Sequence, residues 1–320
     1  MPLISLFLAF LLQDPPKEPE PTAPAAAFLD VDRLSLQTGV LLGPGRIAGR
    51  LGVEWTQFED LSDPEMRARA VDHLRIEALE SSLLATLTVA YGVSDDVQLG
   101  ARFGWISGND PRVAILSALP STTALDDFDL SGLTDLWITG KFSAHRDGDD
   151  AVAFVAGVKF PIGQDEEKSD AGIVIEPVST AGTGAFDALF GLAWTHRIDD
   201  TLYIDLGGNT TVRGESRNYE VGQRIDVAGA LNWRFLGADD GMRFTAFVGL
   251  DLRNASKSRI DGSTLEYTGG LAISATLGVR AALTRMITVS LAPQFPLAQA
   301  LKGDQSETRV RILFGITVEF

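Results

Sequence analysis

The end of the chain shows its hydrophobic pattern most clearly. Between residues 308 and 320, apolar side chains occupy every second position, namely Val310, Ile312, Phe314, Ile316, Val318 and Phe320. The positions between them are polar or small except for Leu313, and they comprise Arg309, Arg311, Gly315, Thr317 and Glu319. Alternate side chains of a strand point to opposite faces, so this pattern predicts a strand with one apolar and one charged face.

The same two-faced pattern recurs from about Arg46 onward. It predicts strands over 46–58, 76–91, 97–107, 132–144, 151–161, 185–197, 201–212, 221–235, 242–253, 266–280, 286–293 and 308–320. Short turns alternate with long loops, which we expect at 59–75, 108–131, 162–184, 213–220, 254–265 and 294–307. This alternation is typical of a barrel with short periplasmic turns and long extracellular loops. We therefore expect an all-β fold, a closed antiparallel up-and-down transmembrane β-barrel of about 12 strands, with about 10 or 14 also compatible.

The N-terminal residues differ from the rest. Leu3–Leu12 is an apolar run, too short for a membrane-spanning helix of roughly 20 residues and typical of a secretory signal. We expect residues 1–27 to be a signal peptide with a Pro-rich linker, and 46–320 to be the barrel. Residues 28–45 are either a periplasmic segment or an extra strand. Ser62 followed by Pro64 predicts a short helix over about 64–74 in the first long loop.

Alternation alone is also compatible with a soluble sandwich or a lipocalin-like barrel, whose apolar face points inward. Four features favour the membrane: the signal-like start, the long uniform hairpins, the terminal Phe320, and aromatic residues near both ends of the apolar face. We expect the aromatic girdles to contain Trp55, Trp105, Phe160, Tyr219 and Tyr267 at the loop ends, and Tyr91, Phe142, Trp194, Trp233 and Phe235 at the turn ends. The expected location is the outer membrane of a Gram-negative-type bacterium.

Composition narrows the function further. The formal net charge is −16 and there is no cysteine, which argues against a nucleic-acid partner and excludes thiol chemistry. The three histidines, at 73, 145 and 196, align with no serine on a shared face, so we expect no enzyme. Acidic residues gather at 126–129 and 165–170. We interpret them as a solvated surface rather than a divalent-cation site, and expect neither metal nor cofactor.

Glycine-rich motifs carry a family resemblance. They run from Gly132-Leu133-Thr134-Asp135-Leu136 through Gly157–Gly163 to Gly182–Asp187 and Gly191–Trp194. These motifs resemble the outer-membrane transporter family of the MetA-pathway-of-phenol-degradation type, which is distantly similar to long-chain fatty-acid channels. The resemblance implies a barrel that passes small, often aromatic or apolar molecules, and it supplies no catalytic motif. The proline-rich N-terminus departs from the pattern.

The polar face is expected to line the interior. The candidate lining residues are Arg50, Glu54, Arg102, Asp135, Trp137, Lys141, Lys159, Asp187, Tyr203, Asp205, Arg224, Asp226, Arg234, Arg243, Phe247, Asp251, Arg280, Arg309 and Arg311, and Arg253 and Glu319 share that face. Charges inside a barrel must be paired or hydrated. They therefore either tune a pore or fill a narrow barrel with ion pairs. The aromatic members Trp137, Tyr203 and Phe247 either contact an apolar solute or fill space.

These features predict a channel for passive passage of small molecules, with apolar or aromatic ones among the candidates. The alternative is a sealed barrel with a structural or adhesive role through its extracellular loops. The expected partners are outer-membrane lipid, a small-molecule solute, and the barrel-insertion machinery, which we expect to recognise Phe320.

Overall fold

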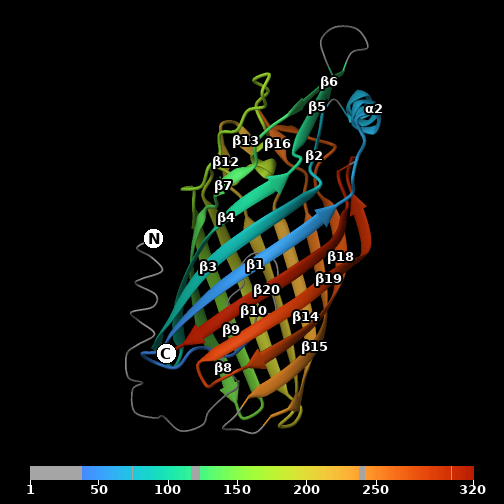
Figure 1. The fold of residues 1–320 in the computed structure, drawn as a ribbon. Coiled ribbons are helices and arrows are strands. Elements are labelled where there is room, and N and C mark those ends of the chain that lie inside the picture. The colour runs from blue at the N-terminus through green and yellow to red at the C-terminus, as the bar shows by residue number, and fades with distance from the viewer. Residues whose placement is uncertain (1–37, 74, 117–122, 238–241, 304) are drawn as a thin grey trace, which may run out of the picture.

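The computed structural model describes residues 38–73, 75–116, 123–237, 242–303 and 305–320. Its centre is a closed antiparallel ring of 12 strands (Figure 1). In chain order these are β1 (Ile47–Phe58), β3 (Ser81–Ser94), β4 (Val97–Asn109), β8 (Leu136–Asp147), β9 (Asp150–Phe160), β10 (Asp187–Arg197), β11 (Leu202–Val212), β14 (Arg224–Leu236), β15 (Arg243–Ala255), β18 (Gly270–Ala282), β19 (Ile287–Leu301) and β20 (Thr308–Glu319). The predicted barrel class and strand number are confirmed. The expected signal peptide and linker lie outside the described residues.

The first and last strands close the ring. β1 pairs antiparallel with β20, with Val53 opposite Phe314. The ladder ends in two backbone hydrogen bonds, from Ile47 N to Phe320 O at 3.1 Å and from Phe320 N to Ile47 O at 2.8 Å. Closure pairs the backbone groups that an open edge would expose to lipid. Recognition of Phe320 by insertion machinery stays a prediction.

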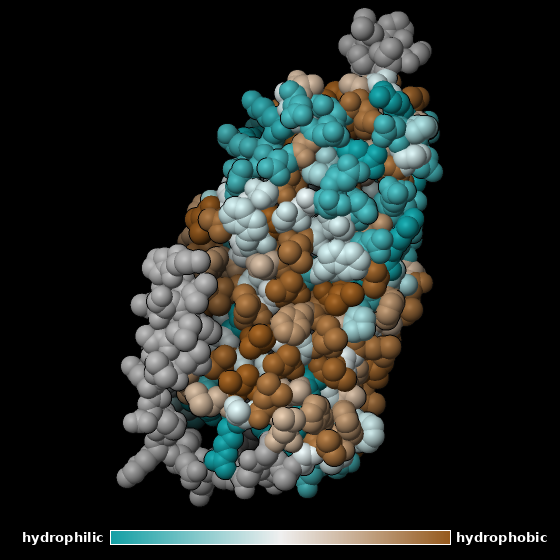
Figure 2. All heavy atoms as spheres, in the orientation of Figure 1, coloured by the Kyte–Doolittle hydropathy of each residue, from teal (hydrophilic) through white to brown (hydrophobic). Residues whose placement is uncertain are grey.

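Apolar side chains cover the lower and middle part of the barrel face shown in Figure 2, and exposed large apolar residues, the apolar belt, recur on all 12 strands of the ring. The predicted apolar face points outward, with Val248 exposed at 49%, Leu250 at 57% and Phe154 at 55% of their surfaces. Trp105, Tyr91 and Trp233 are exposed near the strand ends, as an interfacial girdle requires. Water would not favour so many exposed large apolar side chains, whereas lipid does. The chain is an outer-membrane protein.

Tyr219 and Tyr267 are corrections to the expected girdle. Tyr219 is buried, at 5% exposure, and both phenol groups hydrogen-bond Glu176 in the extracellular part of the chain. Tyr219 belongs to the short strand β13 (Tyr219–Glu220) rather than to the membrane-spanning strand β14 that begins at Arg224. The alternation of apolar and polar residues continues past the true end of the strand, so the pattern wrongly indicated a lipid-facing position for Tyr219.

The extracellular end is more structured than the predicted loops. The helix expected over 64–74 is confirmed as α2 (Asp63–His73). It begins with one half of a capping box, since the Glu65 carboxylate accepts hydrogen bonds from Ser62 N at 2.8 Å and Ser62 Oγ at 2.6 Å. It packs Met66 and Ala70 against a sheet of β2 (Arg75–Ala78), β5 (Arg112–Leu116) and β6 (Thr123–Asp127). No helix among the described residues has the length and apolar character to cross a bilayer.

Several other bounds differ from the prediction. The strand expected over 76–91 is two strands, β2 and β3, and the one expected over 132–144 is β7 (Ser131–Leu133) followed by β8. A second extracellular sheet joins β12 (Glu215–Ser216), β13, β16 (Arg259–Ile260) and β17 (Ser263–Thr264), and a 3-10 turn, η1, covers Pro177–Ser179. These short strands lie where the sequence predicted loops, and their pairing depends on partners distant in the chain.

The loop expected over 294–307 is wrong over its first half. Strand β19 continues to Leu301, although Pro293 and Pro296 interrupt the pattern. Pro296 lies opposite Ser274 where the β18–β19 register shifts, and a bulge tolerates a residue that cannot donate to the ladder. Beyond Gln294, β19 no longer pairs with β20. The backbone N–H that Pro296 lacks is therefore not needed for hydrogen bonds with β20.

Candidate functional site: the barrel interior and its two mouths

The predicted lining residues differ in burial. Ten are buried: Glu54, Arg102, Asp135, Trp137, Lys141, Lys159, Asp187, Asp205, Asp226 and Phe247. Eight are half-buried: Arg50, Tyr203, Arg224, Arg234, Arg243, Asp251, Arg280 and Arg311. Arg309 is exposed, because β20 at that point has passed its last pair with β19, Gln294 opposite Arg311. The polar positions of the alternating pattern therefore point into the barrel, except at its extracellular rim.

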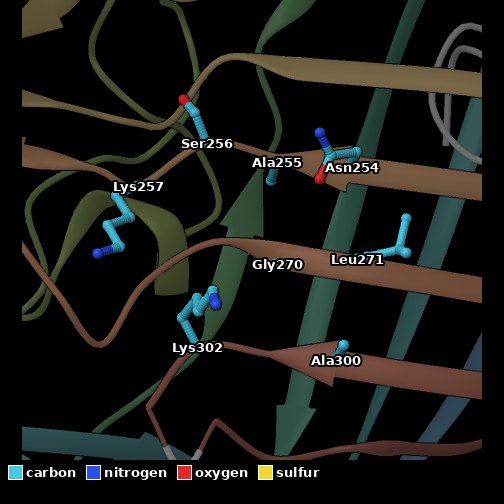
Figure 3. Close-up of a pocket in the computed structure, with 8 residues that line it drawn as sticks. All are labelled: Asn254, Ala255, Ser256, Lys257, Gly270, Leu271, Ala300 and Lys302. Carbon is cyan, nitrogen blue, oxygen red and sulfur yellow. The ribbon is translucent and has the colours of Figure 1, made fainter.

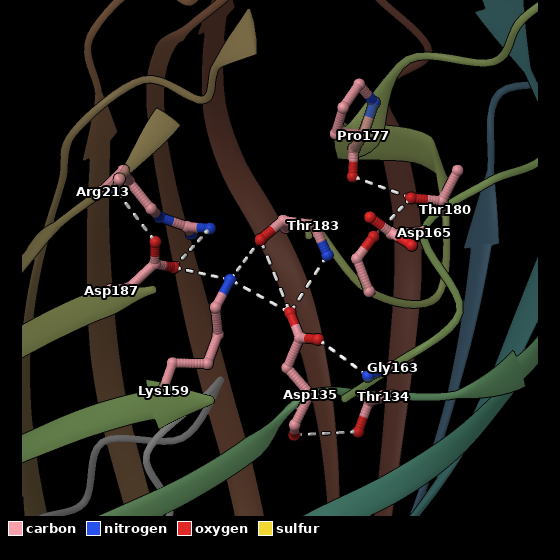
Figure 4. Close-up of polar contacts among 12 residues, drawn as sticks. Thr134, Asp135, Lys159, Gly163, Asp165, Pro177, Thr180, Thr183, Asp187 and Arg213 are labelled. Atoms are coloured by element: carbon pink, nitrogen blue, oxygen red, sulfur yellow. Dashed lines mark hydrogen bonds and ion pairs between the residues drawn. The ribbon is translucent and has the colours of Figure 1, made fainter. Parts of the chain in front are cut away.

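Lys159 is the centre of a buried ion cluster near the extracellular end (Figure 4). Its Nζ lies 3.1 Å from Asp135 Oδ2 and 2.8 Å from Asp187 Oδ2, and it donates to Thr183 Oγ1. Arg213 NH1 lies 3.4 Å from Asp187 Oδ2. Two cations thus face two carboxylates, and each buried charge has an opposite charge beside it. Sequence reasoning omitted Arg213 and Thr183 because both lie outside the strands.

The same cluster holds the cap loop, residues 161–186. Asp135 accepts hydrogen bonds from Gly163 N and Thr183 N, each at 3.0 Å. Gly182 allows this approach, since a Cβ there would lie 2.8 Å from Asp135 Oδ1. Farther along, Asp165 pairs with Arg217 at 2.6 Å, and Val174 O accepts from Arg75 at 2.7 Å. These partners belong to different sides of the ring, so the cap loop crosses the extracellular mouth.

Glu176 ties the cap loop to two other loops. Its carboxylate accepts hydrogen bonds from Tyr219 Oη and Tyr267 Oη, each at 3.0 Å, and lies 3.6 Å from Arg75 Nε. Glu77 also pairs with Arg75 and accepts from Glu176 N at 3.1 Å. Burial, with the Glu77 carboxylate beside it, raises the pKa of Glu176. Burial and the Glu176 charge likewise raise the pKa of Tyr219.

The interior contains further ion pairs toward the extracellular ends of other strands. Asp226 lies 2.7 Å from Arg224 Nε and 2.9 Å from Arg253 Nε, and Glu54 lies 3.0 Å from Arg311 Nε. On the barrel strands, three buried oxygens have neither a hydrogen-bond partner nor an ion pair among the described residues: Asn209 Oδ1, Thr211 Oγ1 and Asp251 Oδ1. A buried acceptor of this kind requires water or a polar ligand group.

A hydrogen-bonded chain of side chains occupies the turn end. Thr195 Oγ1 donates to Asp205 Oδ1 at 2.6 Å, and Asn232 Nδ2 donates to Asp205 Oδ2 at 3.1 Å. Arg280 then donates to Asn232 Oδ1 at 3.1 Å and to Tyr203 Oη at 3.3 Å. These residues face one another from β10, β11, β14 and β18, so the network joins three neighbouring strands and reaches past β15 to a fourth.

The N-terminal segment, residues 38–45, lies at this mouth and forms no strand. Thr38 Oγ1 lies 2.7 Å from Thr195 Oγ1, and Gly39 N donates to Thr195 Oγ1 at 2.9 Å. The Lys141 ammonium donates to the carbonyls of Thr38 and Val40. Leu42 N then donates to Gln98 Oε1 at 2.8 Å. The segment therefore contacts β10, β8 and β4, which together with β9 are successive strands of the ring, so it lies along one side of the turn-end mouth.

Glycine is required at the start of this segment. A Cβ on Gly39 would lie 1.8 Å from the backbone oxygen of Ala151, whereas one on Gly43 would meet only the Arg46 side chain at 3.5 Å. The segment therefore touches the barrel wall at Gly39. Lys141 was predicted as an interior residue, but its partners Thr38 and Val40 were not, since backbone carbonyls leave no signal in a side-chain pattern.

The predicted interior aromatics lie in separate places. Trp137 packs with Val155 and Leu189, and Phe247 packs with Ala292 and Leu313. The Arg280 guanidinium carbon lies 4.5 Å from the centre of the Phe247 ring, a cation–π distance. The structure does not bring Trp137 and Phe247 into one cluster.

The predicted acidic loops serve partly as attachment points. Asp126 Oδ2 accepts a hydrogen bond from Ala171 N at 2.6 Å, and hydrogen bonds from Ser169 and this amide lower the pKa of Asp126. Over the described ranges, no three His, Cys, Asp or Glu side chains come together in a group that could hold a metal ion.

Comparison with known proteins adds a family and a fold. Residues 79–294 match the family model described as "Putative MetA-pathway of phenol degradation". The solved COG4313 outer membrane channel from Pseudomonas putida F1 superimposes with a TM-score of 0.63 at 12% identity, covering 88% of this chain and 98% of that one. The NanC porin gives 0.45 at 10% identity, with 84% and 98% covered. No curated protein matches the chain.

Proposed function

Because the chain belongs to the family described as "Putative MetA-pathway of phenol degradation", we propose that it is a passive outer-membrane channel for small molecules. The structure described above is its closed state. The cap loop closes the extracellular mouth and the N-terminal segment closes the periplasmic mouth. Passage requires both to move.

The interior oxygens without partners are the observation that carries this proposal. A barrel built only as a sealed support would be expected to pair its buried polar atoms or replace them with apolar ones. Asn209, Thr211 and Asp251 instead each keep an unpaired oxygen on the interior face. A hydrated path, or a solute with hydroxyl groups, supplies the missing partners.

We further propose small aromatic molecules that carry a hydroxyl group as the preferred solutes. Trp137 and Phe247 offer buried rings on the interior face, and Tyr203 lies beside Arg280. Rings and polar groups in one lining suit a solute that has both. Charged residues of both signs leave no strong preference for the solute's charge.

Solute-swelling of proteoliposomes tests the proposal. We would compare the wild type with the Gly39→Val/Lys159→Met variant, which loosens both closures, using a hydroxybenzoate and a sugar of similar size. A channel swells with both solutes in the variant and faster with the aromatic one. Protein-free liposomes set the background.

The second candidate is a sealed barrel whose extracellular loops bind a partner. The closure of both mouths favours it. If the doubly loosened variant folds and inserts but swells no faster than protein-free liposomes, the sealed barrel is the better account.

A further inference from the structure

A cavity of about 400 Å³ lies on the outer surface at the extracellular ends of β15, β18 and β19 (Figure 3). It is lined by Asn254, Ala255, Ser256, Lys257, Gly270, Leu271, Ala300 and Lys302. Asn254, Leu271 and Ala300 are neighbours across the three strands. Their row continues to Ile225, which is 49% exposed to the outside. The cavity therefore faces away from the interior.

The apolar belt begins directly below this row. Two residues farther down the strands, Leu252 lies opposite Val227 and Ile273, and Leu252 and Val227 are both exposed large apolar side chains. Above the row, the chain leaves the strands for the extracellular loops. The cavity thus lies where the hydrocarbon of the outer leaflet gives way to its headgroups.

Two lysines stand at the upper edge of the cavity. Lysines are few in this chain, at positions 17, 141, 159, 168, 257 and 302, and Lys141 and Lys159 are buried in the interior. Lys257 and Lys302 line this one cavity, on a protein with a net charge of −16. A pair of cations on such an acidic protein, directly above an apolar surface, is complementary to an anionic lipid headgroup.

The backbone shapes the cavity. Gly269 and Gly270 have φ values of 80° and 133°, which other residues rarely adopt. A Cβ on Gly270 would lie 2.6 Å from Ala300 O. Lys302 N donates to Gly269 O at 3.0 Å and fixes the neighbouring segment. The hollow and its second lysine therefore depend on two glycines in left-handed or extended positive-φ conformations.

We propose that this cavity binds a phosphate group on a glycolipid of the outer leaflet. Lys257 and Lys302 pair with the phosphate oxygens, since ammonium groups bind phosphate as point charges. Leu271 and Ala300 contact the sugar and the start of the acyl chains. The Glu266 carboxylate, which pairs with Lys257 and is 76% exposed, is displaced, because an exposed ion pair of this kind is weak.

Native mass spectrometry of the folded protein with purified lipid A tests this proposal. The Lys257→Gln/Lys302→Gln variant should retain bound lipid roughly 30-fold less than the wild type, from the usual effect of two cations at an anionic surface. Lys168→Gln, which removes an exposed lysine of the cap loop, should leave retention unchanged. Dephosphorylated lipid A should bind the wild type as weakly as intact lipid A binds the double variant.

Two further arms separate the alternatives. Glu266→Gln should strengthen binding, because it removes the carboxylate that competes for Lys257. Inorganic phosphate at millimolar concentration should not displace the lipid; displacement would show a site for free phosphate and overturn the lipid assignment. Equal retention of lipid A by the wild type and the double lysine variant would overturn the proposal outright. None of these outcomes depends on whether the barrel conducts.

Discussion

Different contacts hold the two segments that lie at the mouths of the barrel. At the extracellular mouth, Lys159 and Asp135 hold the cap loop through Gly163 and Thr183, and Asp187 and Arg213 complete the ion cluster. At the periplasmic mouth, Lys141, Thr195 and Gln98 hold a stretch of backbone through carbonyl and amide groups. One closure depends on opposite charges, and the other on the fit of a glycine against the wall. The first should respond to pH, and the second to side-chain volume.

The two mouths should lie on opposite sides of a bilayer, with the apolar belt between them in the hydrocarbon. Val248 lies in the middle of β15 and Val212 ends β11, and both point outward. Arg at Val248 meets hydrocarbon near the midplane and should cost ~2–4 kcal/mol, whereas Arg at Val212 should cost ~0–1 kcal/mol near the interface. We expect Val248→Arg to abolish most membrane-inserted protein and Val212→Arg to be tolerated. The folded fraction on heat-modifiability gels measures both. If the two variants gave equal yields, our position for the apolar belt would be wrong, and so would the assignment of the two mouths to opposite sides of the bilayer.

The next largest effect is expected on conductance, because a solute must pass both mouths one after the other. Gly39→Val should expel the N-terminal segment, because its side chain would overlap Ala151 O. Lys159→Met should loosen the cap loop, because it leaves the buried Asp135 carboxylate without its cation. Each single variant still has one closed mouth, so its conductance should rise only a few-fold. The double variant should conduct at least about 10-fold more than either, judged by planar-bilayer recordings.

Gly43→Ala is the matched control for this series, since its Cβ would make only an ordinary contact with Arg46. It should leave the conductance of the Lys159→Met background unchanged. If one single variant alone gave the full conductance, only that mouth would be closed, and the series arrangement would fail.

The smallest effect concerns pH at the extracellular mouth. Burial and Glu77 raise the pKa of Glu176, so the folded cap binds a proton more tightly than the unfolded loop does. The contribution of Glu176 to the stability of the folded cap loop is fully present below the ordinary carboxyl pKa. It is lost as the pH rises through the raised pKa of Glu176. The cap loop should therefore resist proteolysis a few-fold better near pH 5 than near pH 8. Glu176→Gln should remove this difference, while Glu166→Gln, at an exposed position of the same loop, should preserve it. If the pH dependence persisted in Glu176→Gln, a group other than Glu176 would be its cause.

Side-chain parity explains which parts of this structure could be predicted from the sequence. Within a strand, the environment of Val248 or Asp226 follows from its neighbours two positions away, and both faces were identified correctly. Tyr219 and Arg309 were misplaced because alternation continues past the strand ends, where it no longer reports a face. Pro296 hid the second half of β19, because the bulge that accepts it forms with a partner strand.

The closures were harder to predict. Asp135, Lys159 and Asp187 were each recognised as interior residues, yet their arrangement around one ammonium depends on the register of β8, β9 and β10. The N-terminal segment was predicted only as a periplasmic segment or an extra strand. Its contacts left no signal in the sequence, since Lys141 binds its backbone carbonyls rather than its side chains. Contacts of this kind depend on the path of the chain and not on residue type.

Thiol labelling tests the two-closure account most directly, because the chain has no native cysteine. Asn209 is buried on the interior face, between the Asp205 network and the Lys159 cluster, and Asn209→Cys places a reporter between the mouths. In oriented proteoliposomes, a membrane-impermeant thiol reagent should label this cysteine from neither side. Adding Gly39→Val should permit labelling from the periplasmic side alone, and adding Lys159→Met from the extracellular side alone. Labelling from the same side in both variants, or ready labelling without either, would contradict the account.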